Sequence, residues 1–597
     1  MSTHPQSTDP FTSGWMEEGL YYRGEAPPQG EDWDDDDWVY LPHENYIPVS
    51  KSRVISAMKN ELGDLFGGEA YQHFIELLEG VYHFHYHKVL NELKEDYEYF
   101  SPSMGDQMRT GVEQSELYQR EQNFLINFIH LMIRGNFNSL GEAEYTQADQ
   151  HSYLLDLPID VNWKIKDPAM YQRLFSYSAS EEGQRAIEDR LGVDNLERFL
   201  DLPRTFDQRI MIFHRGIEPD RTEGLFFMQK VNRVFDKFFE LILQPFQKGV
   251  NTVTEKTEDL VEGTLERGKN LLSGQPFAPR ALAEDEGGSP DGAVVADSVV
   301  FLPRWLRRTS LENQRFSVKN LFTSSLLQEP AIERVICVFR QYPPSPPPFL
   351  NKIPILGRFI DMPEPDSKDP TIHVKLFQHI PLADLEIIFP EKRIKMKPLD
   401  KFMLIFLGLI GLVVGVTKGM GGDGDKSAVA VVFSVLLLLA IKTVTRFLNT
   451  RRKYMLQMSQ DLYHKNLDND VGVIQYLVDN IEDQEFKEAF IAYMLLAKAG
   501  QPLTEDELDE AAERFLNSHF GGLEVDFEVD DALDKITVEL DAQGQEVQTD
   551  DQSESTLFLP LVVAFTGEDG ETRYRAKPID QALEAMDYRW DNFFDYN

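Results

Sequence analysis

The chain has 597 residues, of which 42% are hydrophobic and 27% are charged. Because a single hydrophobic core does not grow to this size, the length predicts several structural units. The chain carries 100 acidic residues against 59 basic ones, a formal net charge of −41, and such an anionic surface repels nucleic acid. Cys337 is the only cysteine, which excludes an internal disulfide.

Residues 1–46 are acidic and rich in turn-forming residues, and they include the run EDWDDDDW. We expect a mostly disordered tail here. The tail has neither the basic start and apolar run of a signal peptide nor the arginines of a mitochondrial presequence, so we expect neither signal. Residues 47–200 carry apolar residues at helical spacing and are expected to form a mainly helical region.

The helical region contains the run VYHFHYHKVL, with histidines at alternate positions. His83 and His87 would share one face of a helix, as two zinc ligands can. The same face also carries polar and charged side chains, which indicates a solvated surface, and no second ligand pair stands nearby. We therefore expect no metal and no other cofactor, with His83 and His87 as the ligands if a metal binds.

Residues 201–400 are expected to form an α+β region, with an antiparallel sheet and helices beside it. Four runs predict strands because they are rich in apolar and β-branched residues: RIMIFHRGI, IERVICVFR, IHVKLFQ and LEIIF. We expect the last of these to form a hairpin with RIKMK through the turn PEKR. A disordered insertion near 281–297 and a Pro-rich connection over 343–370 interrupt the region.

The run HIPLAD places His379 and Asp384 five residues apart. This spacing resembles the His-x4-Asp motif of glycerolipid acyltransferases, in which the histidine acts as a base on an acceptor hydroxyl. In those enzymes an FPEG-like element lies far downstream, whereas here FPEK follows at once and Lys392 replaces the glycine. His379 and Asp384 are therefore the candidate catalytic residues of an alternative, enzymatic hypothesis, to which His214 and Arg215 add a second polar pair.

Residues 401–448 contain two strongly apolar runs around a Gly-rich loop. Residues 402–416 carry no charge, and residues 428–441 have Ser434 as their only polar side chain. As helices these runs are about 21 to 23 Å long, so flanking residues must help to cross a hydrocarbon core of about 30 Å. We expect a two-helix transmembrane hairpin; the alternative is a buried helical hairpin in a soluble core.

Basic residues flank the hairpin on both sides, which predicts a two-span membrane protein with its N- and C-terminal parts on the cytoplasmic side. The expected membrane-surface residues are Lys392, Arg393, Lys395, Lys397, Lys401, Lys442, Arg446, Arg451, Arg452 and Lys453. Small residues at a spacing of four let helices approach closely. The expected helix-packing residues are Gly411, Gly415, Gly419, Ala430 and Ser434. Packing within the hairpin ranks first, contact between protomers second and a pore third.

Residues 449–597 are expected to form a helical and winged-helix-like module. Thr504 and Glu507 form a capping-box pattern at the start of one helix. Asp569-Gly570 predicts a hairpin turn between TLFLPLVVAF and TRYRAKP. The stretch 501–597 has 26 acidic and 6 basic residues, so we expect protein partners here and not DNA.

Three runs carry a resemblance to a known family: IHVKLFQHIPLADLEIIFPEKRIKMKPLDK, YHKNLDNDVGVIQYLVDNIEDQEFKEAFIAYMLLA and ALEAMDYRWDNFF. Together with the two apolar runs, they resemble the domain-of-unknown-function family that includes transmembrane protein 143. The resemblance covers the chain from about residue 50 onward and implies an integral membrane protein without an established activity.

The expected function is that of a membrane-anchored interaction or scaffold protein. Its expected partners are the lipid bilayer and other proteins, without nucleic acid, and a homo-oligomer is a further expectation. The alternatives are a membrane-bound lipid-modifying enzyme of acyltransferase type and, ranked lower, a transporter or channel component.

Overall fold

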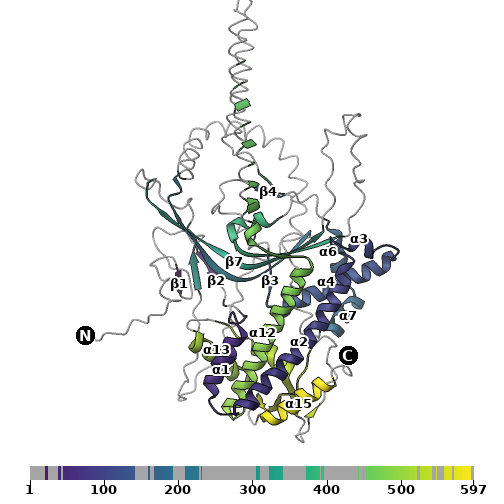
Figure 1. The fold of residues 1–597 in the computed structure, drawn as a ribbon, viewed down its shortest axis with the longest axis vertical. Helices are drawn as coiled ribbons and strands as arrows, with labels where there is room; N and C mark the ends of the chain where they lie inside the picture. The colour runs from purple at the N-terminus through teal and green to yellow at the C-terminus, as the bar shows by residue number, and fades with distance from the viewer. Residues whose placement is uncertain are drawn as a thin grey trace, which may run out of the picture.

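The computed structural model describes several stretches of the chain (Figure 1). The main described stretches are 45–141, 167–191, 209–227, 322–340, 371–389, 462–520, 525–540, 557–567 and 570–592. Shorter pieces include 21–23, 38–41, 159–161, 304–309, 392–394 and isolated positions between 434 and 460.

A five-stranded antiparallel sheet forms the centre of the fold, in the order β10-β8-β7-β5-β3. The strands are β10 (Asn466–Asn469), β8 (Ile372–Pro381), β7 (Ser325–Arg340), β5 (Ile210–Gly224) and β3 (Asn138–Ser139). Side chains alternate between the two faces of each strand. Met211 and Phe213 point into the larger core, and Ile210 and Ile212 point into a smaller core on the other face.

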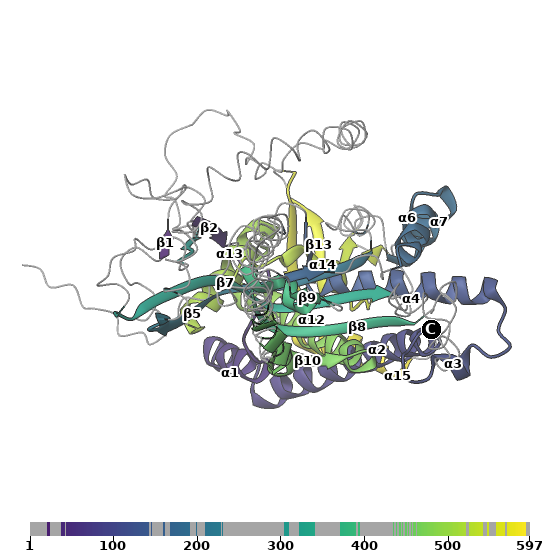
Figure 2. The same cartoon turned by 90° about the horizontal axis from the view of Figure 1, so that it is seen from above.

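Helices cover the face of the sheet that carries the larger core, and Figure 2 shows β7 and β8 passing over them. These helices are α1 (Lys51–Leu62), α2 (Gly68–Glu98), α4 (Gln114–Arg134), α12 (Val471–Ala499) and α15 (Ile579–Asp591). α12 contacts α2, α4, α14 and the sheet. Every residue from 484 to 496 is buried, so α12 is enclosed on all sides over three turns.

The C-terminal part adds two helices and a second sheet. The elements are α13 (Glu505–Phe520), α14 (Val529–Ile536), β11 (Thr537–Leu540), β12 (Glu546–Val547), β13 (Val562–Thr566) and β14 (Thr572–Ala576). The strands lie in the order β12-β11-β13-β14, and Leu503 bridges to Tyr574 of β14. β11 and β12, which were not predicted, stand between the helices and the β13–β14 hairpin, and β11 pairs in parallel with β13. The larger core is continuous across it, since one cluster contains both Phe213 and Leu559.

Smaller elements complete the described chain. They are α3 (Gly105–Met108), α6 (Ala169–Ser178), α7 (Glu181–Leu191), the 3-10 helix η4 (Leu382–Ile388), the sheet β1 (Tyr21–Arg23), β6 (Arg304–Arg307) and β2 (Trp38–Leu41), and the pair β4 (Ile159–Val161) and β9 (Lys392–Ile394). Trp38 and Leu41 are buried although they belong to the tail that was expected to be disordered.

The predicted hairpin between LEIIF and RIKMK is wrong. The first run lies in η4, and β9 within the second pairs with β4. Leu385 and Ile388 of η4 are buried in the smaller core. Their burial against the second face of the sheet accounts for an apolar run that is not a strand, because tertiary packing outweighs intrinsic strand preference.

The described part of the chain contains no helix that is both long enough and apolar enough to cross a bilayer. Its two longest helices, α2 and α12, have 31 and 29 residues, but charged side chains interrupt both. This finding contradicts the predicted transmembrane hairpin over 401–448 and the multi-pass membrane localisation with cytoplasmic N- and C-terminal parts. Residues 401–433 themselves lie outside the described residues.

Candidate functional site: the polar face of helix α12 and a neighbouring aromatic surface

Residues 45–50, called the strap below, have neither helical nor strand structure and lie against α12. Pro48 favours an extended conformation here, because the residue before a proline is restricted to extended backbone angles. The side chains of Tyr46, Ile47 and Val49 are buried, and Ile47 is only 1% exposed. Ser50 is the N-cap of α1, so the strap leads directly into the helical layer.

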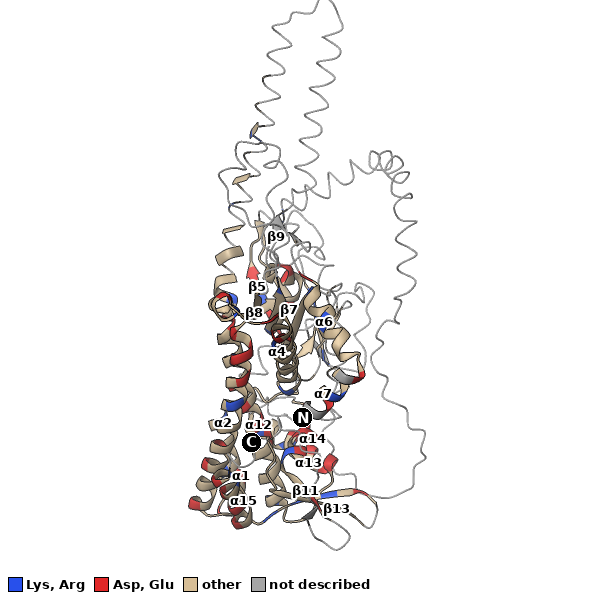
Figure 3. Cartoon of the chain, turned by 90° about the vertical axis from the view of Figure 1, so that its right-hand side faces the viewer, with Lys and Arg blue, Asp and Glu red and all other residues tan. Residues whose placement is uncertain are grey.

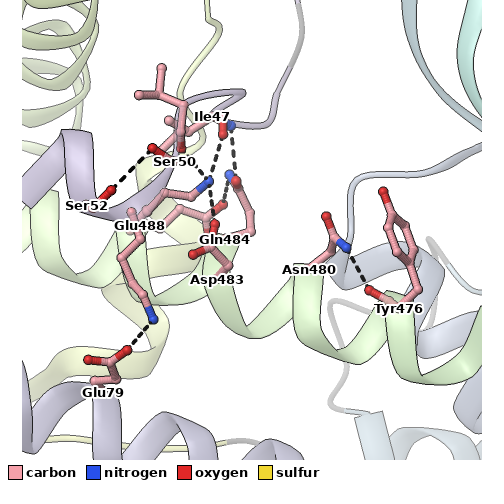
Figure 4. Close-up of polar contacts among 12 residues, drawn as sticks. Ile47, Ser50, Ser52, Glu79, Tyr476, Asn480, Asp483, Gln484 and Glu488 are labelled. Carbon is pink, nitrogen blue, oxygen red and sulfur yellow. Dashed lines mark hydrogen bonds and ion pairs between the residues drawn. The ribbon is translucent and has the colours of Figure 1, made fainter.

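Two side chains of α12 hold the strap by its backbone (Figure 4). The Ile47 N–H donates to Gln484 Oε1 at 3.1 Å. The Lys487 ammonium donates to the carbonyl oxygens of Ile47 and Val49 at 2.8 and 3.1 Å, and it pairs with Asp483 at 3.0 Å. Because these contacts involve backbone atoms, they fix an extended chain whatever its side chains are.

The side chain of Tyr46 adds a specific anchor on the central sheet. Its hydroxyl donates to the carboxylate of Glu333 on β7. The guanidinium carbon of Arg215 lies 4.4 Å from the centre of the Tyr46 ring and 4.6 Å from that of Phe137. Arg215 also donates to the carbonyl of Gly135 at 2.9 Å. The strap therefore rests on β5, β7 and the end of α4 as well as on α12.

The buried carboxyl group of Glu488 lies behind the strap contact. Gln484 Nε2 donates to Glu488 Oε1 at 2.7 Å while Gln484 Oε1 accepts from the strap, so one amide links the two. Burial raises the pKa of Glu488 to about 8, with nearby Asp531 acting in the same direction and Lys535 opposing it. Burial also lowers the pKa of the Lys487 ammonium, an effect that Asp483 opposes. Glu488 is therefore mostly neutral at pH 7.

A second buried carboxylate on α12 is fully paired. Glu485 accepts two hydrogen bonds from the Arg134 guanidinium at 2.5 and 2.7 Å, and Lys535 lies 3.2 Å away. Burial alone would raise the pKa of Glu485, but the charges of Arg134 and Lys535 outweigh it and lower that pKa to about 2. This ionic cluster ties α4, α12 and α14 together.

The strap site presents hydrogen-bonding side chains to an extended segment of the chain. Gln484, Lys487 and Glu333 offer hydrogen-bonding groups to a backbone and to a tyrosine hydroxyl. Among the residues that the structure describes, no group of three or more His, Cys, Asp and Glu residues is placed to hold a metal ion. The geometry shown thus supports recognition of an extended chain.

Two exposed aromatic side chains, called the aromatic patch below, meet where α15 packs on α2. Phe84 of α2 is 41% exposed and Trp590 of α15 is 39% exposed. Trp590 meets Phe84 edge-to-face with ring centroids 5.0 Å apart. The Trp590 ring also covers Gly80, where a Cβ atom would lie only 3.1 Å from it. Gly80 thus lets the Trp590 ring approach α2 closely.

The outward face of α15 beside the aromatic patch is acidic. Asp580, Glu584, Asp587 and Asp591 are all exposed, and their spacing of four, three and four places them on one face of the helix. Tyr588 follows Asp587 directly and is also exposed. Figure 3 shows the positions of acidic residues in red along α15 and α1. The aromatic patch therefore has a negatively charged border.

His379 lies at the end of β8, in a left-handed backbone conformation with φ of 49°. Its imidazole is half-exposed and pairs with Glu218 of β5, and its carbonyl accepts a hydrogen bond from Lys465 at 2.5 Å. Asp384 is buried in η4. The structure thus gives His379 a carboxylate partner from another strand instead of the aspartate of the predicted motif. His214 is buried on β5 beside Arg215.

His83 and His87 lie on one face of α2, as predicted, with ring centroids 6.3 Å apart. Both are exposed. His83 Nδ1 lies 3.2 Å from Glu482 on α12, so His83 contributes to the contact between the two helices.

Most of the predicted packing and membrane-surface residues lie outside the described residues. These are Gly411, Gly415, Gly419, Ala430, Lys395, Lys397, Lys401, Arg446, Arg451 and Lys453. Ser434, Lys442 and Arg452 are exposed helical positions. Lys392 and Arg393 belong to β9, where they stand opposite Val161 and Asp160 of β4.

Sequence reasoning missed the strap site. One signal for it is the run DQEFKE in α12, which places polar residues on every side of a helix. An apolar stretch follows directly, so a helix enclosed on all sides must bury some of these polar groups, and buried polar groups need partners. The identity of the partner segment could not be read from that run.

Comparison with known proteins finds a family without an assigned function. Residues 356–472 match the family described as "Protein of unknown function (DUF3754)". The match spans β8, η4, β9 and β10, and it supports the resemblance given above at the level of a domain of unknown function. Comparison with curated proteins gave no match. Comparison with solved structures gave none either.

Proposed function

We propose that this chain is an interaction or scaffold protein that binds partner proteins through the aromatic patch. The observation that carries the proposal is the contact of two exposed rings, Phe84 and Trp590, on two packed helices. Single exposed apolar residues are ordinary, but clustered exposed rings are typical of binding surfaces. Aromatic residues also supply much of the binding energy at protein interfaces.

The charge beside the patch specifies the chemistry of the partner. The acidic face of α15 favours lysine or arginine opposite it, and the rings favour an apolar side chain. The partner is therefore a basic amphipathic segment of another protein. Nucleic acid does not fit, because the net charge of −41 and the acidic border repel phosphate.

The enzymatic alternative has less support. The acyltransferase-like hypothesis needs His379 and Asp384 to act together, whereas the imidazole of His379 pairs with Glu218. The finer resemblance, to the family that includes transmembrane protein 143, implies no established activity and adds none to this proposal. The transporter alternative has no observation that favours it among the described residues.

Binding of a short fluorescein-labelled amphipathic peptide of leucine and lysine to the full chain tests the proposal. We expect the double charge reversal Asp587→Lys and Asp591→Lys to weaken binding about tenfold or more, as for central interface residues. The control is Asp506→Lys, which makes the same kind of change at an exposed position of α13. If the control weakens binding as much per reversed charge as the double variant does, peptide affinity depends only on the net charge of the protein and the proposal is wrong.

A further inference from the structure

The strap is held differently from the rest of the central fold. It forms no sheet ladder. Apart from the Ser50 carbonyl, which accepts from Arg53 and Val54 of α1, its backbone is held by the side chains of Gln484, Lys487 and Asn136, the last donating to the Asn45 carbonyl at 2.9 Å. Such side-chain hydrogen bonds recognise the backbone of an extended chain, as in peptide-binding grooves. They can break and form again while helix α12 stays folded, because they are not part of its own backbone hydrogen bonds.

The strap also presents its side chains as a bound peptide does. Tyr46 inserts between Arg215 and Glu333, and Ile47 and Val49 are buried. Pro48 is exposed and stiffens the chain between the two apolar residues. The pattern Tyr-Ile-Pro-Val thus combines one aromatic anchor, two apolar anchors and a restricted backbone.

The wall of the site is polar enough to accept water when the strap leaves. Lys487, Gln484, Glu333 and Arg215 all line it, and each carries groups that water can solvate. Opening a wholly apolar core would instead expose surface that water solvates poorly. Water can therefore solvate the polar part of the vacated site, while Ile47 and Val49, which pack in the larger core, set the cost of opening.

We propose that the strap site is a receptor for an extended peptide of the Tyr-Ile-Pro-Val type, filled in cis by residues 45–50, which detach and leave it open to the same sequence in trans. Residues 45–50 of this chain already occupy the site. This inference does not depend on the aromatic patch, which lies on α2 and α15.

Native-state hydrogen exchange on the full wild-type chain provides the first test. The Ile47 amide is bound to the Gln484 side chain, whereas the amides of Phe490 and Tyr493 lie in the enclosed part of α12. We expect the Ile47 amide to exchange at least about 100-fold faster than those two, through local opening. Equal rates would show that the strap leaves only when the fold itself opens, and the proposal would fail.

Peptide binding in trans provides the second test. The probe is a fluorescein-labelled peptide of residues 43–52, HENYIPVSKS, and the protein is the full chain with Ile47→Asp, which weakens the strap in cis. We expect this variant to bind the peptide at least tenfold more tightly than wild type does. Adding Lys487→Met should reverse that gain, because it removes the donors to the two carbonyls.

The control peptide carries alanine at position 46 and aspartate at position 47 and should not bind. Tyr46→Ala serves as a milder variant if Ile47→Asp fails to fold. A variant that retains the exchange protection of α12 but does not bind the peptide contradicts the proposal. Failure of both variants to fold would also contradict it, because the strap would then be an integral part of the core.

Discussion

The carboxyl group of Glu488 gives the sharpest prediction about stability. Burial raises its pKa in the folded state to about 8, against an ordinary value of 4.5. Below pH 4.5 the group is protonated in both states, so its ionisation does not affect stability. Between pH 4.5 and 8 the unfolded chain releases this proton and the folded chain keeps it, so the free energy of unfolding falls as the pH rises. The slope is about 1.4 kcal/mol per pH unit, or about 3 kcal/mol between pH 5 and pH 7.

Glu488→Gln removes the titration but keeps the shape and the oxygen that accepts from Gln484. We therefore expect the variant to gain about 3 kcal/mol over wild type between pH 5 and pH 7. The assay is urea unfolding at several pH values, followed by tryptophan fluorescence. Glu69→Gln, at an exposed position in the first turn of α2, controls for the loss of a carboxylate. A difference between variant and wild type that stays constant from pH 5 to pH 7 would refute the reasoning.

Three further substitutions test the packing around the site. Glu485→Ala should destabilise the fold by about 3 to 5 kcal/mol in urea unfolding, because it leaves the buried Arg134 without its carboxylate; a loss below about 1 kcal/mol would count against that pairing. Gly216→Ala should cost about 2 kcal/mol in the same assay, since φ is 75° and a Cβ atom would lie 2.8 Å from the Glu333 Cβ; an unchanged midpoint would contradict this. His379→Ala should change stability by less than about 1 kcal/mol, because its ion pair is half-exposed, and a larger loss would show that the pair is structural.

Features set by neighbouring residues could be predicted from the sequence. The capping box at the start of α13 is confirmed by two reciprocal contacts: the Thr504 N–H donates to Glu507 at 3.0 Å, and the Glu507 N–H donates to Thr504 Oγ1 at 3.3 Å. The hairpin turn is confirmed as well, with Gly570 at φ of 87° between β13 and β14. Both signals depend on residues only a few positions apart, which is why a single sequence carries them.

Features set by distant contacts could not be predicted. Residues 462–465 are helical, β10 follows directly, and α12 begins only at Val471. Asp470 takes a φ of 57° there and accepts a hydrogen bond from Tyr97 at 2.9 Å. The strap contact joins Ile47 to a side chain 437 positions away. A local sequence pattern does not identify contact partners that are this far apart in the chain.

The membrane prediction rested on the hydropathy of two short runs and on the basic residues that flank them. The runs over 402–416 and 428–441 are shorter than the roughly 20 apolar residues that a spanning helix needs, so the argument depended on their flanks. Uncharged apolar runs also occur in buried helices, as the shorter run over residues 489–497 of α12 illustrates.

The central claim is that the aromatic patch binds partner proteins, and the affinity of the full chain for the leucine–lysine peptide tests it most directly. Phe84→Ala is the decisive variant, and Leu65→Ala, at a position that is 52% exposed, is its control. The account predicts a loss of about tenfold or more for Phe84→Ala and less than about twofold for Leu65→Ala. Equal affinities for wild type and both variants would contradict it.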